Sequence, residues 1–185
     1  MMKVQSLSLS GAYLLNPERH SDARGYFCEV YNRRTFEQHG LFFDFVQDNT
    51  SLSPGVNTMR GLHFQRPPSA QAKLIWVSQG SVQDVIVDIR RSSPTYGKYL
   101  SIELSASNGL QLLVPRGFAH GFLTTSPNTQ AHYKTDAGYA AEHDVGLLWN
   151  DPDLGIEWKC DGDKVLISEK DRKLSRLRDL PPYFP

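Results

Sequence analysis

The sequence has no net charge and no long apolar run. Lys plus Arg and Asp plus Glu both number 20, so the formal net charge is zero at pH 7. No global field therefore attracts nucleic acid or an anionic membrane, but a local basic pocket stays open, and binding of phosphate would need a few placed side chains. Polar residues interrupt the first twenty positions, so we expect no signal peptide and no membrane span.

Cysteine is also scarce. The two cysteines, Cys28 and Cys160, lie far apart and form no C-x-x-C motif. This spacing favours free thiols in a reducing compartment, with a structural disulfide as the less favoured alternative. We therefore expect a cytoplasmic protein.

Short stretches of alternating apolar residues dominate what is present. A length of 185 residues suits one domain with one core, spanning residues 1–185. Residues 99–104 and 84–89 alternate with period two, and turn signals such as "QRPPS" and "SASNG" separate such stretches. Many short strands at this spacing predict an all-β sandwich or barrel.

Helical signals are few. Residues 32–40 could form a short helix, with Asn32 as its N-cap and Gly40 as its stop. Residues 169–180 allow either a helix or an extended strap. The helices are therefore expected to be short and peripheral.

Polar residues that could carry chemistry gather around one predicted strand. Arg60 and His63 lie within "RGLHFQ", and Lys73 follows ten residues after His63. Each is ordinary alone, because a strand histidine is often structural and lysine and arginine are usually solvated. Tyr133 alone would be a barrel-wall aromatic. Their joint occurrence with the segments described below is what favours a site.

A histidine at a barrel rim suggests the cupin class, which often binds a metal. One cupin metal motif, P-x-G-x-x-H, is present and ends at His120. The H-x-H motif is broken, because Gln65 stands two residues after His63 and no suitably spaced Glu follows. Two imidazoles without a carboxylate make a poor divalent site. We expect a cupin-type jelly-roll β-barrel that holds no metal.

Longer segments connect these residues to a known family. They occur in one order over nearly the whole chain: "DARGYFCEVYNRRTF", "FVQDNTSLS", "RGLHFQRPPSAQAKL", "VDIRRSSPTYGKY", "LLVPRGFAHGF", "YKTDAGYAAEHDVGLLWNDPDLGIEW" and "ISEKDRKLSRL". Together they resemble the dTDP-4-dehydrorhamnose 3,5-epimerases. The resemblance implies inversion of C3 and C5 of dTDP-4-dehydro-6-deoxy-D-glucose to give dTDP-4-dehydro-L-rhamnose. Both carbons are alpha to a ketone, so enolates can form without a cofactor.

The resemblance also implies catalytic roles. His63 resembles the base, and Asp171 resembles the carboxylate that would orient it and stabilise the imidazolium. Lys73 resembles the group beside the enolate oxygen, where a fixed ammonium stabilises developing charge. Tyr133 resembles the acid that returns a proton from the opposite face.

Further positions resemble substrate-binding residues of the family. Arg24 and Arg60 resemble diphosphate contacts, and Tyr139 resembles the aromatic that stacks on thymine. Phe27 is expected to stack on the same base from the other subunit of a homodimer. The remaining expected polar contacts are Glu29, Gln47, Asn49, His120, Asp144 and Lys170. Asp144 stands where family members often have Glu, so its reach is one methylene shorter.

Other functions stay open at this point. A C3-only epimerase, or one acting on a GDP-linked sugar, could use the same proton-transfer residues. A non-catalytic sugar-nucleotide-binding cupin need not keep His63, Tyr133 and Asp171 together. A metal-dependent cupin oxygenase is disfavoured by the missing H-x-H. Counting solvent deuterons incorporated at C3 and C5 would separate the epimerases from each other and from a binder.

Overall fold

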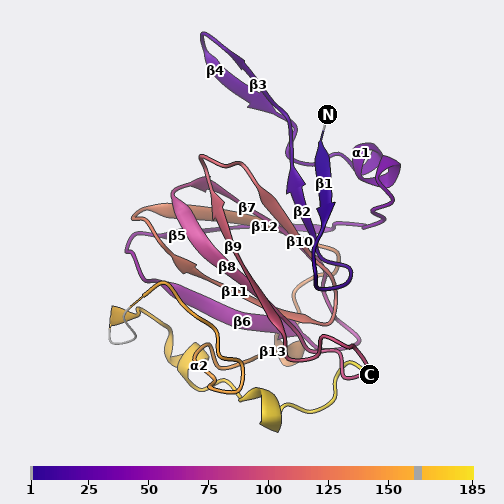
Figure 1. Ribbon diagram of the computed structural model, residues 1–185, viewed down its shortest axis with the longest axis vertical. Coiled ribbons are helices and arrows are strands. Elements are labelled where there is room, and N and C mark those ends of the chain that lie inside the picture. The colour runs from indigo at the N-terminus through magenta and orange to yellow at the C-terminus, as the bar shows by residue number, and fades with distance from the viewer. Residues whose placement is uncertain (1, 161–163) are drawn as a thin grey trace.

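The computed structural model, which describes residues 2–160 and 164–185, consists mainly of two antiparallel β-sheets that face each other (Figure 1). The six-stranded sheet has the order β1 (Lys3–Ser6), β2 (Tyr13–Asn16), β10 (Gln111–Val114), β7 (Lys73–Gln79), β12 (Thr129–Thr135) and β5 (Gln47–Ser53). The five-stranded sheet has the order β13 (Asp144–Gly146), β6 (Met59–Gln65), β11 (Phe118–Thr124), β8 (Ser81–Asp88) and β9 (Tyr99–Ser105). The prediction of an all-β jelly roll is confirmed.

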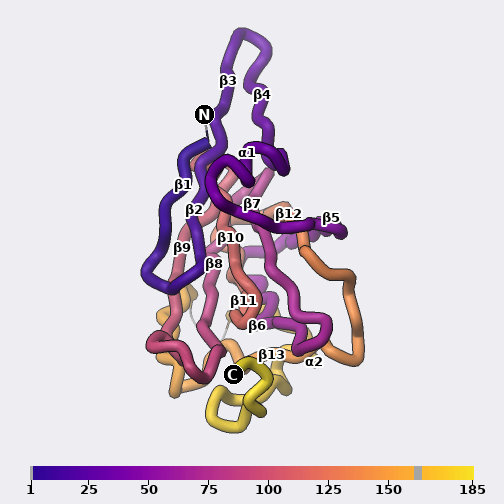
Figure 2. Tube along the Cα trace, turned by 90° about the vertical axis from the view of Figure 1, so that its right-hand side faces the viewer, coloured from indigo at the N-terminus to yellow at the C-terminus, as the bar shows by residue number. Residues whose placement is uncertain are grey.

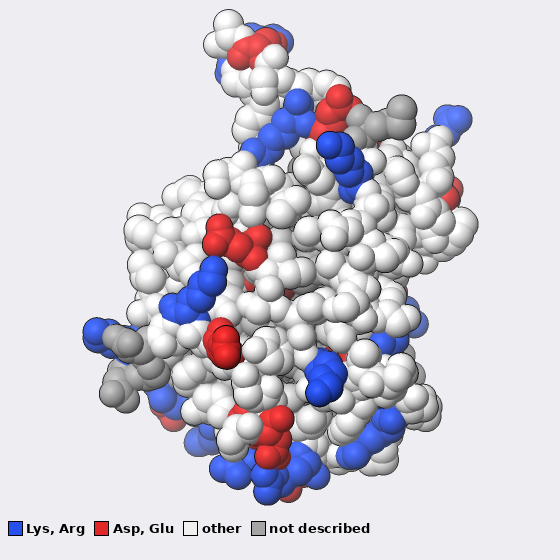
Figure 3. Space-filling view, viewed as in Figure 1, with Lys and Arg blue, Asp and Glu red and all other residues white. Residues whose placement is uncertain are grey.

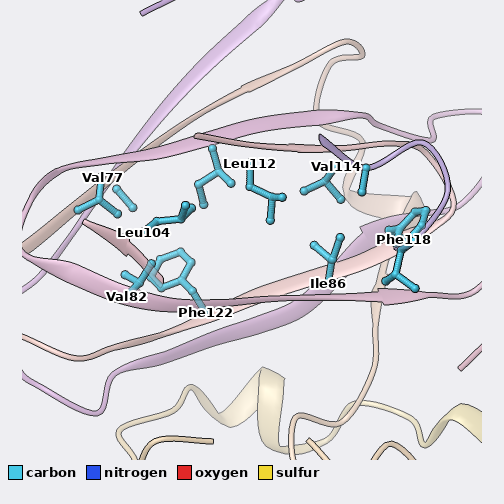
Figure 4. Close-up of a cluster of buried hydrophobic side chains, with 12 residues drawn as sticks. Val77, Val82, Ile86, Leu104, Leu112, Val114, Phe118 and Phe122 are labelled. Atoms are coloured by element: carbon cyan, nitrogen blue, oxygen red, sulfur yellow. The ribbon is translucent and has the colours of Figure 1, made fainter. Parts of the chain in front are cut away.

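Strand β8 explains how the apolar alternation builds two cores. Val82 and Ile86 point between the sheets, where they pack with Leu104, Leu112 and side chains from other strands (Figure 4). The intervening Val85 and Val87 belong to a second cluster outside the barrel. Both faces of the strand are therefore buried, and the buried residues of β8 include the polar Gln83, Asp84 and Asp88.

The C-terminal segment forms the outer wall of that second cluster. Leu154, Leu177 and Leu180 pack against Leu62 of β6 and the outer residues of β8. Within the segment, α2 (Glu169–Arg172) is a single turn capped by the Ser168 side chain. Short 3-10 turns lie at Ala141–His143 and Leu177–Asp179. The chain from 169 to 180 is thus a strap with one α-helical turn and one 3-10 turn, so it contains both the helix and the extended chain that the sequence allowed.

The predicted N-terminal helix is confirmed as α1 (Arg33–Gln38). The Asn32 side chain accepts hydrogen bonds from the backbone N–H groups of Arg34 and Thr35. Gly40 follows the helix with φ +75°, a left-handed conformation that ends helices well. Phe36 anchors the helix in a third apolar cluster.

A two-stranded hairpin, β3 (Arg19–Asp22) and β4 (Gly25–Cys28), projects from the barrel (Figures 1 and 2). The Arg19 guanidinium holds its base by donating to the carbonyl oxygens of Ala106 and Ser107. Beyond that point Tyr26 and Phe27 are 58% and 70% exposed. A lone hairpin is marginally stable in water, so the contacts of Arg19 with the barrel and with the Tyr26 ring help to hold it.

Charged groups of both signs are interspersed over the face in Figure 3, which agrees with the zero net charge. None of the helices in the described part of the chain has the length and apolar character needed to cross a membrane. Surface charge therefore does not point to a particular partner, and the informative polar groups are those inside the barrel.

Candidate active site

Two histidines lie directly opposite each other on neighbouring strands inside the barrel. His63 of β6 and His120 of β11 are register partners. The strands approach closely beside them at Gly61 and Gly121, where a Cβ on Gly61 would lie 2.7 Å from the Gly121 Cα. Gly61 also has φ +111°, which other residues rarely adopt. Glycine at this point allows the two imidazoles to share one cavity.

The cavity has a volume of about 510 Å³ and an opening to solvent. Its lining comes from both sheets and from the C-terminal strap. The polar side chains that line it are Ser51, Thr58, Arg60, His63, Lys73, His120, Tyr133, Ser168, Lys170 and Asp171. Residues separated by more than 100 positions thus meet at one place, and they include all four predicted catalytic residues.

The strap delivers Asp171 to His63. The carboxylate lies 2.8 Å from His63 Nε2 and also accepts the backbone N–H of Gly61 at 3.2 Å. Burial favours a higher pKa for Asp171, but the hydrogen bonds from His63, Gly61 and Ser168 outweigh it and hold the pKa below its ordinary value. An ionised Asp171 accepts a hydrogen bond from Nε2–H, which leaves Nδ1 as the nitrogen with a free lone pair.

Lys73 begins β7 and reaches the same cavity. Its ammonium donates to the backbone carbonyl oxygen of His63 at 3.3 Å. Burial lowers the pKa of Lys73 to about 8, although the carboxylates of Asp144 and Asp84 favour the charged form. At neutral pH the ammonium can therefore stabilise a nearby oxyanion and can also donate a proton.

Tyr133 lies on β12, where it pairs with Ile75 of β7. Burial is the main reason that the pKa of Tyr133 is raised, and the nearby Arg60 opposes the shift only in part. The phenol consequently keeps its proton at neutral pH. A half-buried O–H group at the cavity wall is a suitable proton donor.

A second cavity of about 430 Å³ meets the first at His63, Lys73 and Tyr133, which line both. The predicted contacts Gln47 and Asn49 are here on β5. The Gln47 side chain donates to Asn49 Oδ1 at 2.8 Å and accepts the backbone N–H of Tyr139 at 2.9 Å. The proposed proton-transfer groups thus lie where two binding spaces join.

Asp144 ties two predicted binders together. Its Oδ2 accepts a hydrogen bond from Lys170 Nζ at 2.5 Å and from the Tyr139 hydroxyl at 3.2 Å. The hydrogen bond from Lys170 to Asp144 is the main reason that the pKa of Lys170 is raised. In this arrangement Asp144 links Tyr139, which lines the second cavity, to Lys170, which lines the first.

Of the remaining predicted substrate-binding residues, one lines a cavity that holds His63 and three lie on or near the hairpin. Arg60 lines the first cavity, where its guanidinium donates to Ser53 Oγ at 3.2 Å. Arg24 and Phe27 are on the hairpin, and neither lines the cavities that hold His63 in its own chain. Glu29 lies just beyond the hairpin and accepts a hydrogen bond from Asn32. Their predicted contacts with substrate stay predictions.

The sequence reasoning missed two residues that contact the candidate site. Asp84 of β8 is fully buried, and both of its oxygens lie 3.0 Å from His120 Nε2. Gln65 donates to the Gly138 carbonyl oxygen and accepts the Ala140 N–H, which fixes the loop that carries Tyr139. The available signal for Asp84 was an aspartate beside the apolar run Val85–Val87 of a predicted strand. Gln65 had been considered only as the residue that breaks H-x-H.

No group of three or more His, Cys, Asp or Glu is arranged to hold a metal ion within residues 2–160 and 164–185. His63 and His120 instead each bond to a separate aspartate through Nε2. The chemistry that these residues support by themselves is proton transfer beside a fixed positive charge.

Comparison with known proteins identifies the family. The family profile described as dTDP-4-dehydrorhamnose 3,5-epimerase matches residues 6–179. The chain belongs to the dTDP-4-dehydrorhamnose 3,5-epimerase family. A relative of that name from Sinorhizobium fredii is 49% identical over 183 residues, which cover 99% of this chain and 93% of the relative.

Solved structures of this family share the fold. The Legionella pneumophila epimerase, in complex with dTDP-4-keto-L-rhamnose, has a TM-score of 0.94 and 35% identity, with 100% of this chain and 98% of that chain covered. The Streptomyces bikiniensis 3'-monoepimerase ChmJ, in complex with dTDP-quinovose, has a TM-score of 0.87 and 32% identity, with coverage of 93% and 86%. The fold therefore accompanies both double and single epimerisation.

Proposed function

We propose that this chain inverts C3 and C5 of dTDP-4-dehydro-6-deoxy-D-glucose and forms dTDP-4-dehydro-L-rhamnose. The observation that carries the proposal is the joining of His63–Asp171, Lys73 and Tyr133 in one cavity of a member of this epimerase family. A binding protein would not require a base, its carboxylate partner and a cavity-lining phenol together.

Each inversion is a proton exchange at a carbon beside the ketone. His63 Nδ1 takes the proton from C3 or C5, and the electron pair of the C–H bond moves into the enolate. Lys73 stabilises the enolate oxygen, where negative charge develops. Tyr133 returns a proton to the other face of the carbon, and solvent restores the protonation states of Tyr133 and His63. Electrons balance within the sugar, so we propose that neither redox cofactor nor metal takes part.

Other side chains bind the nucleotide. We propose that Arg60 holds the diphosphate, since its fork can donate to two phosphate oxygens. Tyr139 offers a ring for the thymine, while Gln47, Asn49, His120 and Lys170 provide polar contacts. Asp144 keeps Tyr139 and Lys170 in place, as the hydrogen bonds between them suggest.

We propose that the protein acts as a homodimer in which the hairpin of one subunit completes the cavity of the other. The support is the projecting β3–β4 hairpin, with Arg24 and Phe27 exposed and distant from their own cavity. Residues 1–185 would act as a single domain, because the C-terminal strap supplies both Asp171 and part of the second core. Sedimentation of a fully active monomer would contradict the dimer. The cytoplasm remains the proposed location, from the cysteine pattern.

Solvent deuterium provides the test. The purified protein is incubated in deuterated water with dTDP-4-dehydro-6-deoxy-D-glucose, and C3 and C5 are followed by NMR. We expect deuterium at both carbons and a product with both centres inverted. Deuterium and inversion at C3 alone would favour the second candidate, a 3-epimerase, to which the similarity to ChmJ gives some weight. No exchange at either carbon, with the nucleotide sugar still bound, would favour a binding protein.

A further inference from the structure

Asp84 is a buried acid to which the proposed mechanism assigns no role. Its side chain is 0% exposed and lies behind His120, and it is absent from the lining of the cavity. Both carboxylate oxygens lie 3.0 Å from His120 Nε2. An isolated ionised carboxylate in such a place would be strongly destabilising, so its presence in a buried strand requires a compensating charge or donor.

His120 supplies the donor. The ring is 7% exposed and lines the cavity, so the nitrogen that does not face Asp84 is the one available to a ligand. A carboxylate on Nε2 fixes the proton there and leaves Nδ1 as an acceptor in the neutral ring. This arrangement mirrors His63 and Asp171, but the second acid comes from the neighbouring strand β8 and not from the strap.

Lys73 supplies the charge. Asp84 and Lys73 interact electrostatically, and each favours the ionised form of the other. Burial raises the pKa of Asp84, whereas His120 and Lys73 oppose the rise. Asp144 of β13 is the other carboxylate that favours charged Lys73. The other titratable or charged groups that line the two cavities with Lys73 are Arg60 and His63 on β6, His120 on β11, Tyr133 on β12, Tyr139 before β13, and Lys170 and Asp171 on α2.

We propose that Asp84 is a positioning residue that fixes the tautomer of His120 and holds Lys73 as an ammonium for the enolate step. It acts through these two groups and does not touch the substrate. The proposal deepens the proposed function and rests on it for the enolate. Its electrostatic part concerns the free protein and can be measured without turnover.

The first experiment follows the Lys73 ammonium by NMR in ligand-free protein with labelled lysine, assigned with a Lys73→Arg variant. We expect the wild-type midpoint near pH 8. In Asp84→Asn one negative charge is lost at nearly constant volume, so the midpoint should fall by about half a unit to one unit. An unchanged midpoint would overturn the proposal.

Asp88→Asn is the matched control. Asp88 lies on the same strand and is also 0% exposed, but its carboxylate bonds to Arg90, Ser93 and Thr95. This variant should lower stability and leave the Lys73 midpoint near that of wild type. If Asp88→Asn moves the midpoint as much as Asp84→Asn does, the effect is general loosening of the barrel and the proposal is wrong.

Two measurements on unaltered protein apply even if Asp84→Asn does not fold. The ring ¹⁵N shifts of His120 should show the proton on Nε2, and the carboxyl ¹³C shift of Asp84 should show an ionised group at pH 7. A protonated Asp84 at that pH, or a proton on His120 Nδ1 alone, would contradict the proposal.

Turnover separates this inference from the proposed function. In Asp84→Asn we expect kcat/KM for the nucleotide sugar to begin its alkaline decline at a lower pH than in wild type, by the same shift as the Lys73 midpoint. Asp84→Glu should move the decline part of the way back toward the wild-type pH. If wild-type protein shows the expected Lys73 midpoint and His120 tautomer but exchanges no deuterium into the sugar, the proposed epimerase function is wrong while the interactions of Asp84 with His120 and Lys73 are supported. An active enzyme whose alkaline limb does not move in Asp84→Asn would refute the role of Asp84 alone.

Discussion

His63 and His120 are register partners on the adjacent strands β6 and β11, yet the carboxylates bonded to them lie in different environments. Asp171 arrives on a one-turn helix of the strap, where several N–H groups hold its pKa below the ordinary value despite burial. Asp84 is part of the barrel itself, and burial raises its pKa in spite of His120 and Lys73. The same two residue types therefore have different proposed roles: His63 with Asp171 accepts a proton from the substrate, whereas Asp84 fixes the ring of His120. The surroundings decide the difference.

Removing each histidine should give the largest contrast. In His63→Ala, deuterium exchange at C3 and C5 should fall about 10²–10⁴-fold, because the base acts before every later step. In His120→Ala, exchange should continue at a reduced rate with a raised KM, since the base is intact. Both are read by NMR in deuterated water. The comparison fails if His120→Ala abolishes exchange as completely as His63→Ala does.

Tyr133→Phe should separate exchange from inversion. The ring is kept, so packing should survive, while net epimerised product should fall by about 10²-fold because the donor for the second face is gone. His63 can still take a proton and return deuterium to the same face, so exchange without inversion should persist at one or both carbons. Loss of exchange equal to that in His63→Ala would show that the two roles are not distinct.

Lys73 bonds to the His63 carbonyl oxygen and interacts electrostatically with Asp84, and its ammonium should set the alkaline limit of activity. Its pKa is lowered to about 8, so the charged form predominates below that pH and is lost as pH rises through it. We expect kcat/KM to decline about tenfold per unit above the midpoint. Lys73→Arg keeps its charge at all these pH values, so any activity it retains should lack this decline. A wild-type profile that stays level to pH 10 would contradict the role of Lys73.

Asp171 should show the smallest effect, on acid stability. Its pKa is lower in the folded protein than the ordinary 3.8, so its stabilising contribution is complete above pH 4–5 and is lost as pH falls through the folded value. Asp171→Asn should lower the free energy of unfolding at pH 7 by about 1 kcal/mol. The difference from wild type should shrink in acid. Urea unfolding at pH 7 and pH 3 provides the measurement, and an equal difference at both would argue against the assigned pKa direction.

Local patterns in the sequence predicted much of the fold. The alternation in residues 84–89 and 99–104 indicated strands, and Asn32 and Gly40 marked the ends of α1, because caps and turns depend on neighbouring residues only. The alternation did not show that both faces of β8 are covered. That depends on the C-terminal strap, which is more than 60 residues away in the chain.

By itself, the sequence determined the family, the jelly roll and the set of residues capable of proton transfer. Motif order and residue type are sufficient for these, since they do not depend on distance. The resemblance had already implied Asp171 as the partner of His63, and only the tertiary structure revealed the second pair, Asp84 with His120. It placed Asp171 beside His63 across 108 positions, and it placed Asp84 beneath His120, because strand register and the path of the strap set these contacts. It also left Arg24 and Phe27 on a projecting hairpin, since its strands pair with each other and extend away from the barrel.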